Sequence, residues 1–277
     1  IDIFHQENIN FYFPGTDVEL KFCSKNKKYF KEKYSVHTVI SSQETIEISD
    51  NKYKTAEFLK KNNFHFPETE YAHKAQDKDL KFPLILKPAR GYGSIGVFRI
   101  NDRDELQKHN LEDENLIIQE LIGTDDDEYT CTVVKMNGKL SLVLPLQRTL
   151  RSGDTYQANP IKSNTIESYI KSIANKLDID GGCNFQLRLN KDGIPKVFEI
   201  NSRFSGTTPF CAQLGFNPVE YYLKNFLNIS YAPVVNYDAQ VLRFWNEIVV
   251  KKENTAELKL EKELNKSTVT HLNLFKE

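Results

Sequence analysis

A carboxylate, an amide and a guanidinium occupy every second position from Glu199 to Arg203. The side chains of a β-strand point to alternate faces, so we expect Glu199, Asn201 and Arg203 to share one face while Phe198 and Ile200 enter a core. Carboxylate and amide oxygens are ligands for a hard cation such as Mg²⁺, which keeps room for substrate phosphates. A solvated hairpin face would show the same alternation, so this stretch alone leaves both interpretations open.

A second alternating run, at residues 183–190, supplies a partner strand for this row. Residues 191–193 between the two runs have the composition of a hairpin turn. One register keeps every apolar side chain on the same face, and a slip of one residue would lose it. That register pairs Asn190 with Pro195, Gln186 with Glu199 and Asn184 with Asn201. The hairpin therefore predicts a patch of oxygen ligands with an arginine at its end.

The composition limits the class of protein. The chain has 277 residues, of which 39% are hydrophobic, so it can bury a large core. Its net charge of −1 predicts no nucleic-acid partner and no anionic membrane partner. Four scattered cysteines without a CxxC pair, no apolar run of membrane-spanning length and no signal pattern favour a cytoplasmic α/β protein. The chain begins at Ile1 rather than at methionine, which leaves open whether residues precede it.

The first residues predict a small βαβ fragment. Residues 9–13 and 36–40 are strand candidates, and Thr16 to Glu19 form a capping box that begins a helix ending near Lys33. The fragment is too small for a complete sheet domain. Just after it, Ser49-Asp50 predicts the cap of a second helix.

Two lysines and a glycine-rich loop predict a phosphate site. Lys52 lies in the first turn of a predicted helix at 51–62, where the helix dipole disfavours a cation unless a phosphate is near; a solvated lysine is the simpler alternative. Lys87 ends a short apolar strand at 82–88, and a glycine-rich loop follows at 91–96. Another strand follows this loop, rather than the helix that a dinucleotide fingerprint requires, and no Walker A lysine closes it. Such a loop is typical of a flap whose backbone N–H groups close over phosphates, although a plain hairpin loop would look the same.

Further strands and helices complete the predicted α/β pattern. Arg148 and Arg151 lie at the outer end of the expected strand at 140–146. The expected strands lie at 97–100, 116–122, 128–134, 140–146 and 240–250, with a hairpin turn at 137–138. The expected helices lie at 102–108, 166–177 and 217–227, followed by a charged tail from residue 251.

The order of these parts resembles the ATP-grasp superfamily, and it is most similar to carbamoyl-phosphate synthase large chains and the small stand-alone ligases like them. The shared parts are a lysine early in a helix, a strand ending in lysine, a glycine-rich flap, a Gln-Glu-Leu-Ile hinge, and Gln followed by Glu-x-Asn-x-Arg. The resemblance covers about residues 9–250. It implies two α+β subdomains that clasp ATP, preceded by part of a Rossmann-like pre-ATP-grasp domain. The implied boundaries are 1–48 for that part, 49–118 for the lid subdomain, 119–250 for the catalytic subdomain and 251–277 for a peripheral tail.

The resemblance also implies a role for each site residue. Those implied to bind ATP are Lys52 and Lys87 at the phosphates, the flap residues Gly91, Gly93, Ser94 and Gly96, Glu120 and the backbone of Ile122 at the adenine, Glu128 at the ribose, and Gln186. Those implied to hold two Mg²⁺ or Mn²⁺ ions are Gln186, Glu199 and Asn201. Those implied to act in catalysis are Arg203 and Lys87. Arg148 and Arg151 lie where related enzymes meet their substrate.

The resemblance implies a ligase reaction. ATP would phosphorylate a small-molecule carboxylate, and an amine or a thiol would then displace phosphate from the acyl-phosphate. Carbamoyl-phosphate synthases usually carry an arginine shortly after the metal-side arginine, where this chain has Phe204-Ser205-Gly206-Thr207. This departure argues against bicarbonate or carbamate as the substrate. Two alternatives stay open, a synthase-like subunit that acts with partner chains and a non-catalytic ATP-binding module; a homodimer is also open.

Overall fold

The computed structural model describes residues 2–75, 79–91, 93–244, 248–249, 252 and 270–271. Residues Ile1–Val241 form one contact unit and Leu242–Glu277 a second. The predicted strand at 240–250 is two short strands, β13 (Val241–Leu242) and β14 (Ile248–Val249), and β14 pairs antiparallel with β15 (Thr270–His271). Most of the predicted tail lies outside the described residues. The features that follow belong to the first unit.

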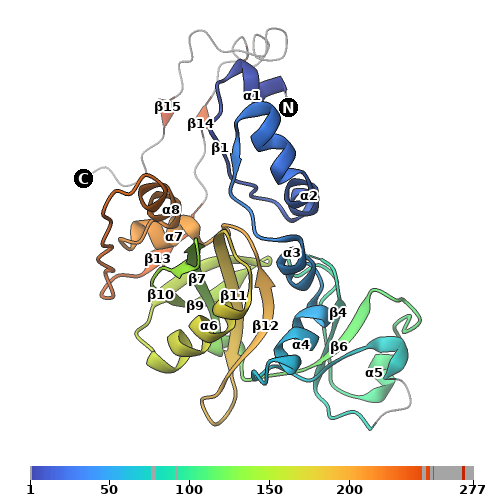
Figure 1. Ribbon diagram of the computed structural model, residues 1–277. Helices are drawn as coiled ribbons and strands as arrows, with labels where there is room; N and C mark the ends of the chain where they lie inside the picture. The colour runs from blue at the N-terminus through green and yellow to red at the C-terminus, as the bar shows by residue number, and fades with distance from the viewer. Residues whose placement is uncertain are drawn as a thin grey trace. The chain divides into compact units, whose positions relative to one another are not determined.

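The N-terminal segment forms the predicted βαβ fragment (Figure 1). After α1 (Asp2–Gln6), the strands β1 (Phe11–Tyr12) and β2 (His37–Thr38) pair in parallel, with α2 (Asp17–Tyr34) between them. The predicted capping box is present, because Thr16 and Glu19 each accept a backbone hydrogen bond from the other end of the turn.

Two helices follow where the sequence predicts one. α3 (Gln43–Ser49) begins at Ser42, whose hydroxyl accepts a hydrogen bond from the backbone of Thr45. α4 (Lys52–Lys61) is capped by Asn51, whose side-chain oxygen accepts from two backbone N–H groups of the first turn. The prediction that Ser49-Asp50 caps this helix is wrong, because Ser49 ends α3.

A small antiparallel sheet follows, with strand order β3-β6-β4-β5. It carries α5 (Arg103–Gln107) on one face, where apolar side chains of β4, β5 and β6 form a core. The strands are β3 (Thr69–Tyr71), β4 (Leu84–Pro88), β5 (Phe98–Ile100) and β6 (Leu116–Glu120). β3 was not predicted, because it is a three-residue edge strand whose side chains are all only partly buried.

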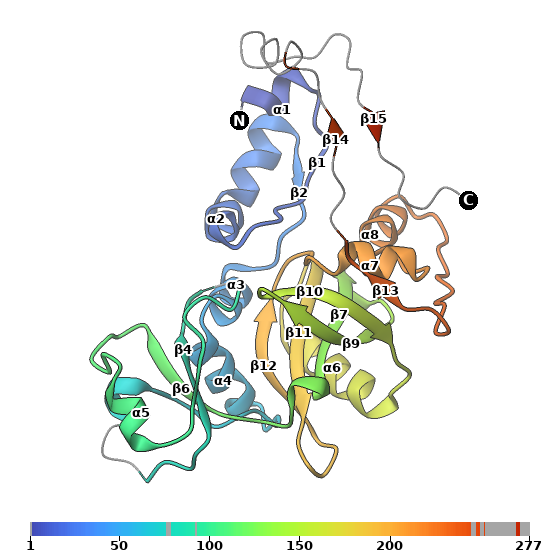
Figure 2. The same cartoon turned by 180° about the vertical axis from the view of Figure 1, so that it is seen from behind.

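The larger sheet of the described residues has strand order β12-β11-β7-β9-β10-β13, with β8 paired to β7. Figure 2 shows this sheet from behind. Its other strands are β7 (Glu128–Met136), β8 (Lys139–Leu140), β9 (Leu144–Arg151), β10 (Asp154–Pro160), β11 (Gly181–Leu189) and β12 (Pro195–Asn201). The predicted turn at Asn137-Gly138 is confirmed, since both residues have positive φ. β10 was not predicted; Ser152 and Gly153, with φ of 52° and 82°, turn the chain back into it.

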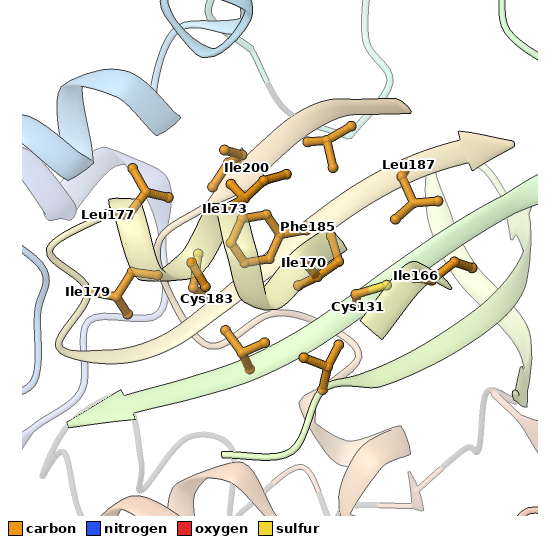
Figure 3. Close-up of a cluster of buried hydrophobic side chains, with 14 of the residues drawn as sticks. Cys131, Ile166, Ile170, Ile173, Leu177, Ile179, Cys183, Phe185, Leu187 and Ile200 are labelled. Carbon is orange, nitrogen blue, oxygen red and sulfur yellow. The ribbon is translucent and has the colours of Figure 1, made fainter. Parts of the chain in front are cut away.

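Helices cover both faces of the larger sheet. α6 (Asn164–Lys176) packs its apolar stripe against β7, β11 and β12, and Figure 3 shows Phe185 of β11 surrounded by Ile170, Ile173 and Ile200. α7 (Thr208–Gln213) and α8 (Pro218–Phe226) pack on the other face, against β7 and β9. Among the described residues, we find no helix that combines the length and the hydrophobicity needed to cross a bilayer.

The β11–β12 hairpin has the predicted register at one end only. Gln186 pairs with Glu199 and Asn184 with Asn201, as predicted. Beyond Gln186 the register shifts by one residue, so Leu189 and not Asn190 pairs with Pro195. The extra residue is Phe198, which forms a β-bulge.

Candidate active site

A cleft of about 720 Å³ lies between the small sheet and the β11–β12 side of the larger sheet. The small sheet contributes the inner face of β4 and β6 and the glycine-rich loop between β4 and β5. The predicted site residues that line the cleft are Lys52, Lys87, Gly91, Gly93, Ser94, Glu120, Ile122, Glu128, Gln186 and Glu199. Gly96 lies at the base of the loop against Pro88, while Asn201 lines a second, smaller cavity.

The bulge places Phe198 in the cleft. The prediction that Phe198 enters the core is wrong, because the bulged residue and Glu199 both face the cleft while Val197 and Ile200 are fully buried on the other face. The Phe198 ring lies under the ammonium of Lys87, whose Nζ is 5.1 Å from the ring centroid. The ring therefore gives the cleft an aromatic floor beside a cation.

Two lysines from different elements converge on Glu199. Lys52 Nζ donates to the carbonyl of Gly91 at 2.9 Å and lies 3.9 Å from Glu199 Oε2. Lys87 Nζ donates to Gln119 Oε1 at 2.8 Å. Burial lowers the pKa of Lys87 to about 8, and the Glu199 charge offsets only part of that effect. An anion in the cleft would relieve this cost for Lys87, and the phosphate contacts of both lysines stay predictions.

The oxygen donors beside these lysines fit a hard cation. Glu199 Oε1 accepts from Asn201 Nδ2 at 3.3 Å, and Gln186 stands opposite Glu199 across the hairpin. No group of three or more His, Cys, Asp and Glu side chains suited to a metal occurs in the described part of the chain. One carboxylate with two amides is a small ligand set, and Mg²⁺ accepts such a set when substrate phosphates and water complete its shell. The donor chemistry therefore fits Mg²⁺ bound together with a nucleotide.

Glu128 is buried between two arginines. Its Oε1 accepts two bonds from Arg148, at 3.1 and 2.6 Å, and its Oε2 accepts two from Arg188, at 3.1 and 2.8 Å. Arg148 also donates to Gln186 Oε1 at 2.9 Å. A carboxylate offers about four acceptor positions. The predicted contact of Glu128 with a ribose therefore requires an arginine to release one of them, and it remains a prediction.

The far end of the cleft, near the β6–β7 connection, combines a charged side chain with an apolar one. Glu120 Oε2 pairs with Lys196 Nζ at 2.8 Å and accepts from the backbone of Glu68 at 3.1 Å. Ile122, which is buried, lines the cleft beside it. These positions suit the edge of a flat heterocycle, and the assigned adenine contacts stay predictions.

The glycine-rich loop meets the turn of the opposite sheet. Gly93, Ser94 and Gly96 all have positive φ, a conformation that favours glycine, and two of the three positions are glycines. At Gly153, in the β9–β10 turn, an added Cβ would lie 2.3 Å from the carbonyl oxygen of Gly93. The two turns therefore touch across the mouth of the cleft, and Gly153 is what lets their backbones approach.

Arg203 lies beyond the row of cleft-lining residues and is paired with Asp17 of α2. Its Nε and Nη2 donate to the two carboxylate oxygens at 2.6 and 2.8 Å. Burial works against the charge of Arg203, but the hydrogen bonds and charge of Asp17 more than offset this and raise its pKa. The structure therefore brings Arg203 close to the oxygen donors but gives it a carboxylate partner.

Several residues of the site lay outside the sequence prediction. Arg188 shares a strand face with Gln186, and that alternation is the available signal for it. Gln119 was assigned to the hinge and not to Lys87. Asp17 gave no signal, because it is 186 residues from Arg203 along the chain. Arg148 contacts Glu128, whereas Arg151 lies over the ring of Tyr156.

Comparisons with known proteins agree with this geometry. A family model described as an ATP-grasp domain matches residues 49–207. The chain is 29% identical over 203 residues to the carbamoyl phosphate synthase large chain of Thermoanaerobacter sp. (strain X514), which covers 65% of this chain but only 19% of the synthase. It is 27% identical over 177 residues to D-alanine–D-alanine ligase of Thermosipho africanus (strain TCF52B), covering 55% of this chain and 47% of that ligase. The crystal structure of L-amino acid ligase from Bacillus licheniformis has the same fold, with a TM-score of 0.62 at 22% identity, covering 79% of this chain and 55% of that one.

Proposed function

The chain belongs to the ATP-grasp family, and we propose that it is an ATP-dependent ligase that joins a carboxylate to an amine through an acyl-phosphate. One observation carries the proposal: Lys52 and Lys87 converge with the oxygens of Glu199 and Gln186 in a single cleft closed by a glycine-rich loop. The cleft thus combines cations and metal-type ligands around the same point. Phosphoryl transfer needs both, because it depends on positioning and charge neutralisation.

Each side chain has a task in the proposed reaction. Lys52 and Lys87 neutralise the ATP phosphates, and Glu120 and Ile122 flank the adenine at the far end of the cleft. Mg²⁺, held by Glu199 with Gln186 and Asn201, neutralises charge on the transferring phosphoryl group when it is bound.

The bonds change in two steps. A substrate carboxylate oxygen attacks the γ-phosphorus of ATP, and ADP leaves with the electrons of the broken P–O bond. The amine nitrogen then attacks the acyl carbon, and phosphate leaves. Arg203 stabilises the negative charge of both transition states only after it has exchanged Asp17 for phosphate.

A second candidate function is a synthase-like subunit that acts with partner chains. The matches to carbamoyl phosphate synthase large chains favour it, since this chain spans only 19% of the length of the first of them. The segment from Phe204 to Thr207, which lacks the second arginine, favours the stand-alone ligase instead.

Hydroxylamine trapping tests the proposed ligase. The protein is incubated with Mg-ATP, a library of carboxylates, and hydroxylamine in place of the amine. We expect at least one carboxylate to give a hydroxamate together with ADP and phosphate, because hydroxylamine intercepts a mixed anhydride. ADP release without hydroxamate across the whole library would contradict the ligase, and a stable phosphoester would assign a kinase instead. Glu199→Gln should lose hydroxamate formation, and the matched control is Glu220→Gln, which makes the same charge change on α8, where Glu220 pairs with Lys224.

A further inference from the structure

A second cavity, of about 250 Å³, continues from the cleft beyond the end of the oxygen-donor row. Gly91 lines both spaces, and Asn201 lines the second cavity two residues after Glu199, which lines the first. Lys52 binds the Gly91 carbonyl and approaches Glu199 at this junction. A molecule in the second cavity would therefore lie next to the phosphate end of a nucleotide in the cleft.

The wall of this cavity carries charges of both signs. Asp17 lines the cavity and pairs at 2.6 Å with Arg203, which does not line it. Asp50 and Arg90 also line the cavity and pair at 3.0 Å, and Lys21, which does not line it, pairs with Asp50 at 2.5 Å. The Asp17 and Asp50 side chains are 31% and 23% exposed, so both carboxylates can be reached from solvent, although the Arg203 side chain is only 16% exposed. A ligand with its own charges can replace one partner of each pair, and at Arg203 the phosphate of the nucleotide must then take the place of Asp17.

The remaining lining fits a small molecule with polar ends. Val18, Leu20 and Ile200 form an apolar part of the wall. Ser202 also lines the cavity, and within the described residues its buried Oγ has no hydrogen-bond partner beyond the weak thiol of Cys183. Sites for drug-sized ligands span about 300–1,000 Å³, so this volume suits a compound smaller than those.

We propose that the second cavity binds an α-amino acid as the amine substrate, with its ammonium at Asp17 and its carboxylate at Arg90. This proposal rests on the proposed ligase function and names the class of its second substrate. The placement puts the nitrogen at the end nearest Asn201 and Arg203, where the acyl-phosphate forms. In the free protein the Asp17 carboxylate is bound to Arg203. The substrate ammonium would replace Arg203 as its partner.

The proton balance gives Asp17 a second task. The bound ammonium passes one proton to the Asp17 carboxylate, and the neutral nitrogen attacks the acyl carbon. The bond from that carbon to the phosphate oxygen breaks, and a second nitrogen proton leaves with phosphate. An amide N–H remains. General bases of this kind contribute about 10²–10⁴-fold.

The test compares two nucleophiles in the full chain. With the carboxylate found by hydroxylamine trapping, each of the common L-amino acids is supplied as acceptor, and amide and hydroxamate are quantified by mass spectrometry. We expect Asp17→Asn to lower the ratio of amide to hydroxamate at least tenfold, because hydroxylamine is largely uncharged at neutral pH and needs no proton acceptor. Asp238→Asn, which makes the same change in a loop outside both cavities, should leave the ratio unchanged.

A binding measurement keeps the two proposals separate. Calorimetry with a non-hydrolysable ATP analogue and Mg²⁺ should show at least one L-amino acid that binds wild type and not Asp17→Asn, whereas the matching amine without a carboxylate binds more weakly. Hydroxamate formation with no amino acid binding and no amide would overturn the amino-acid assignment alone. Absence of hydroxamate with every carboxylate would overturn the ligase, whatever the binding result. An unchanged product ratio in Asp17→Asn would remove Asp17 from the reaction.

Discussion

On one face of the β11–β12 hairpin, Phe185 and Val197 are fully buried against α6; on the other, Gln186 and Glu199 remain partly exposed at the cleft. Neighbouring residues of one strand therefore have different roles, one in the stability of the fold and the other in the chemistry of the site. The α6 face removes apolar area from water and stabilises the fold. The cleft face leaves charges and amides without full packing, which costs stability and gives the site its chemistry.

Each side also holds a buried lysine, and their partners differ. On the α6 side, Lys135 of β7 donates to the carbonyls of Ala174 and Leu177, at 3.0 and 2.8 Å, and so satisfies the end of α6. On the cleft side, Lys87 has one amide acceptor, Gln119, and an aromatic ring. A buried lysine that is bonded to helix carbonyls has its donors satisfied by the fold. A buried lysine that faces a cavity with a single acceptor has donors left to bind an anion.

The largest expected effect is on turnover in Glu199→Gln. The change keeps size and shape but removes the one carboxylate of the donor row, so hydroxamate formation should fall by about 10³-fold or more. The free energy of unfolding should change by less than about 1 kcal/mol, since the side chain is partly exposed. Denaturant titration measures the second quantity. If the variant unfolds readily and ATP binding is insensitive to Mg²⁺, the cleft face has a structural role, and the contrast between the two faces of the hairpin is wrong.

Phe185→Ala should show the opposite behaviour. Truncating this fully buried ring against α6 leaves a cavity and should lower the free energy of unfolding by about 3–5 kcal/mol. The folded fraction should keep its affinity for ATP, because Phe185 does not line the cleft. Urea denaturation and calorimetry below the transition measure the two properties. Loss of nucleotide affinity without loss of stability would show that the two faces are not separable.

Lys87→Met should weaken ATP binding by about 10- to 100-fold, since a desolvated cation lost from an anion site costs about 1.4–2.7 kcal/mol. The matched control is Lys135→Met, the same change at the other buried lysine. Calorimetry with Mg-ATP measures both affinities. Equal binding by wild type and Lys87→Met would place the phosphates elsewhere in the cleft.

The pH dependence of folding should report the burial of Lys87. Because the pKa of Lys87 is about 8 when folded and 10.5 otherwise, the unfolded chain holds this proton more tightly, and stability from this group rises between pH 8 and 10.5. Below pH 8 the full cost is present, so ligand-free Lys87→Met should be more stable than wild type by about 1–3 kcal/mol at pH 7. The difference should shrink toward pH 10.5. A constant difference across this range would contradict the lowered pKa.

The smallest expected effect is in Lys135→Met. The variant leaves two carbonyls at the end of α6 without their donor but also removes a buried charge, so the two terms partly cancel and stability should fall by about 1 kcal/mol. Thermal unfolding measures this change. A larger fall accompanied by loss of ATP binding would link the end of α6 to the cleft.

The sequence predicted the strand register of the hairpin at Asn184 and Gln186, but it did not predict the register nearer the turn, and one reason explains both results. Alternation specifies which residues share a face, so the pairs Gln186–Glu199 and Asn184–Asn201 could be derived. Alternation contains no signal for a bulge, so Phe198 was placed in the core. The edge strand β3 and the strand β10 were not predicted for a related reason, because they lack a clean apolar face. The Arg203–Asp17 pair depends on how distant elements meet, which no local pattern encodes.

The bulge at Phe198 has a consequence for how the hairpin tolerates changes in length. Deleting one residue from a strand ordinarily exchanges its faces beyond the deletion, but deleting Phe198 would join Val197 directly to Glu199 and restore an unbroken ladder with Gln186 and Leu187. Val197 would stay in the core and Glu199 in the cleft. The aromatic floor beneath Lys87 is thus a one-residue insertion that the sheet can gain or lose while its ligands keep their places. The Phe198 ring and the Glu199 carboxylate are adjacent in the chain, yet the ring can be lost without moving the carboxylate.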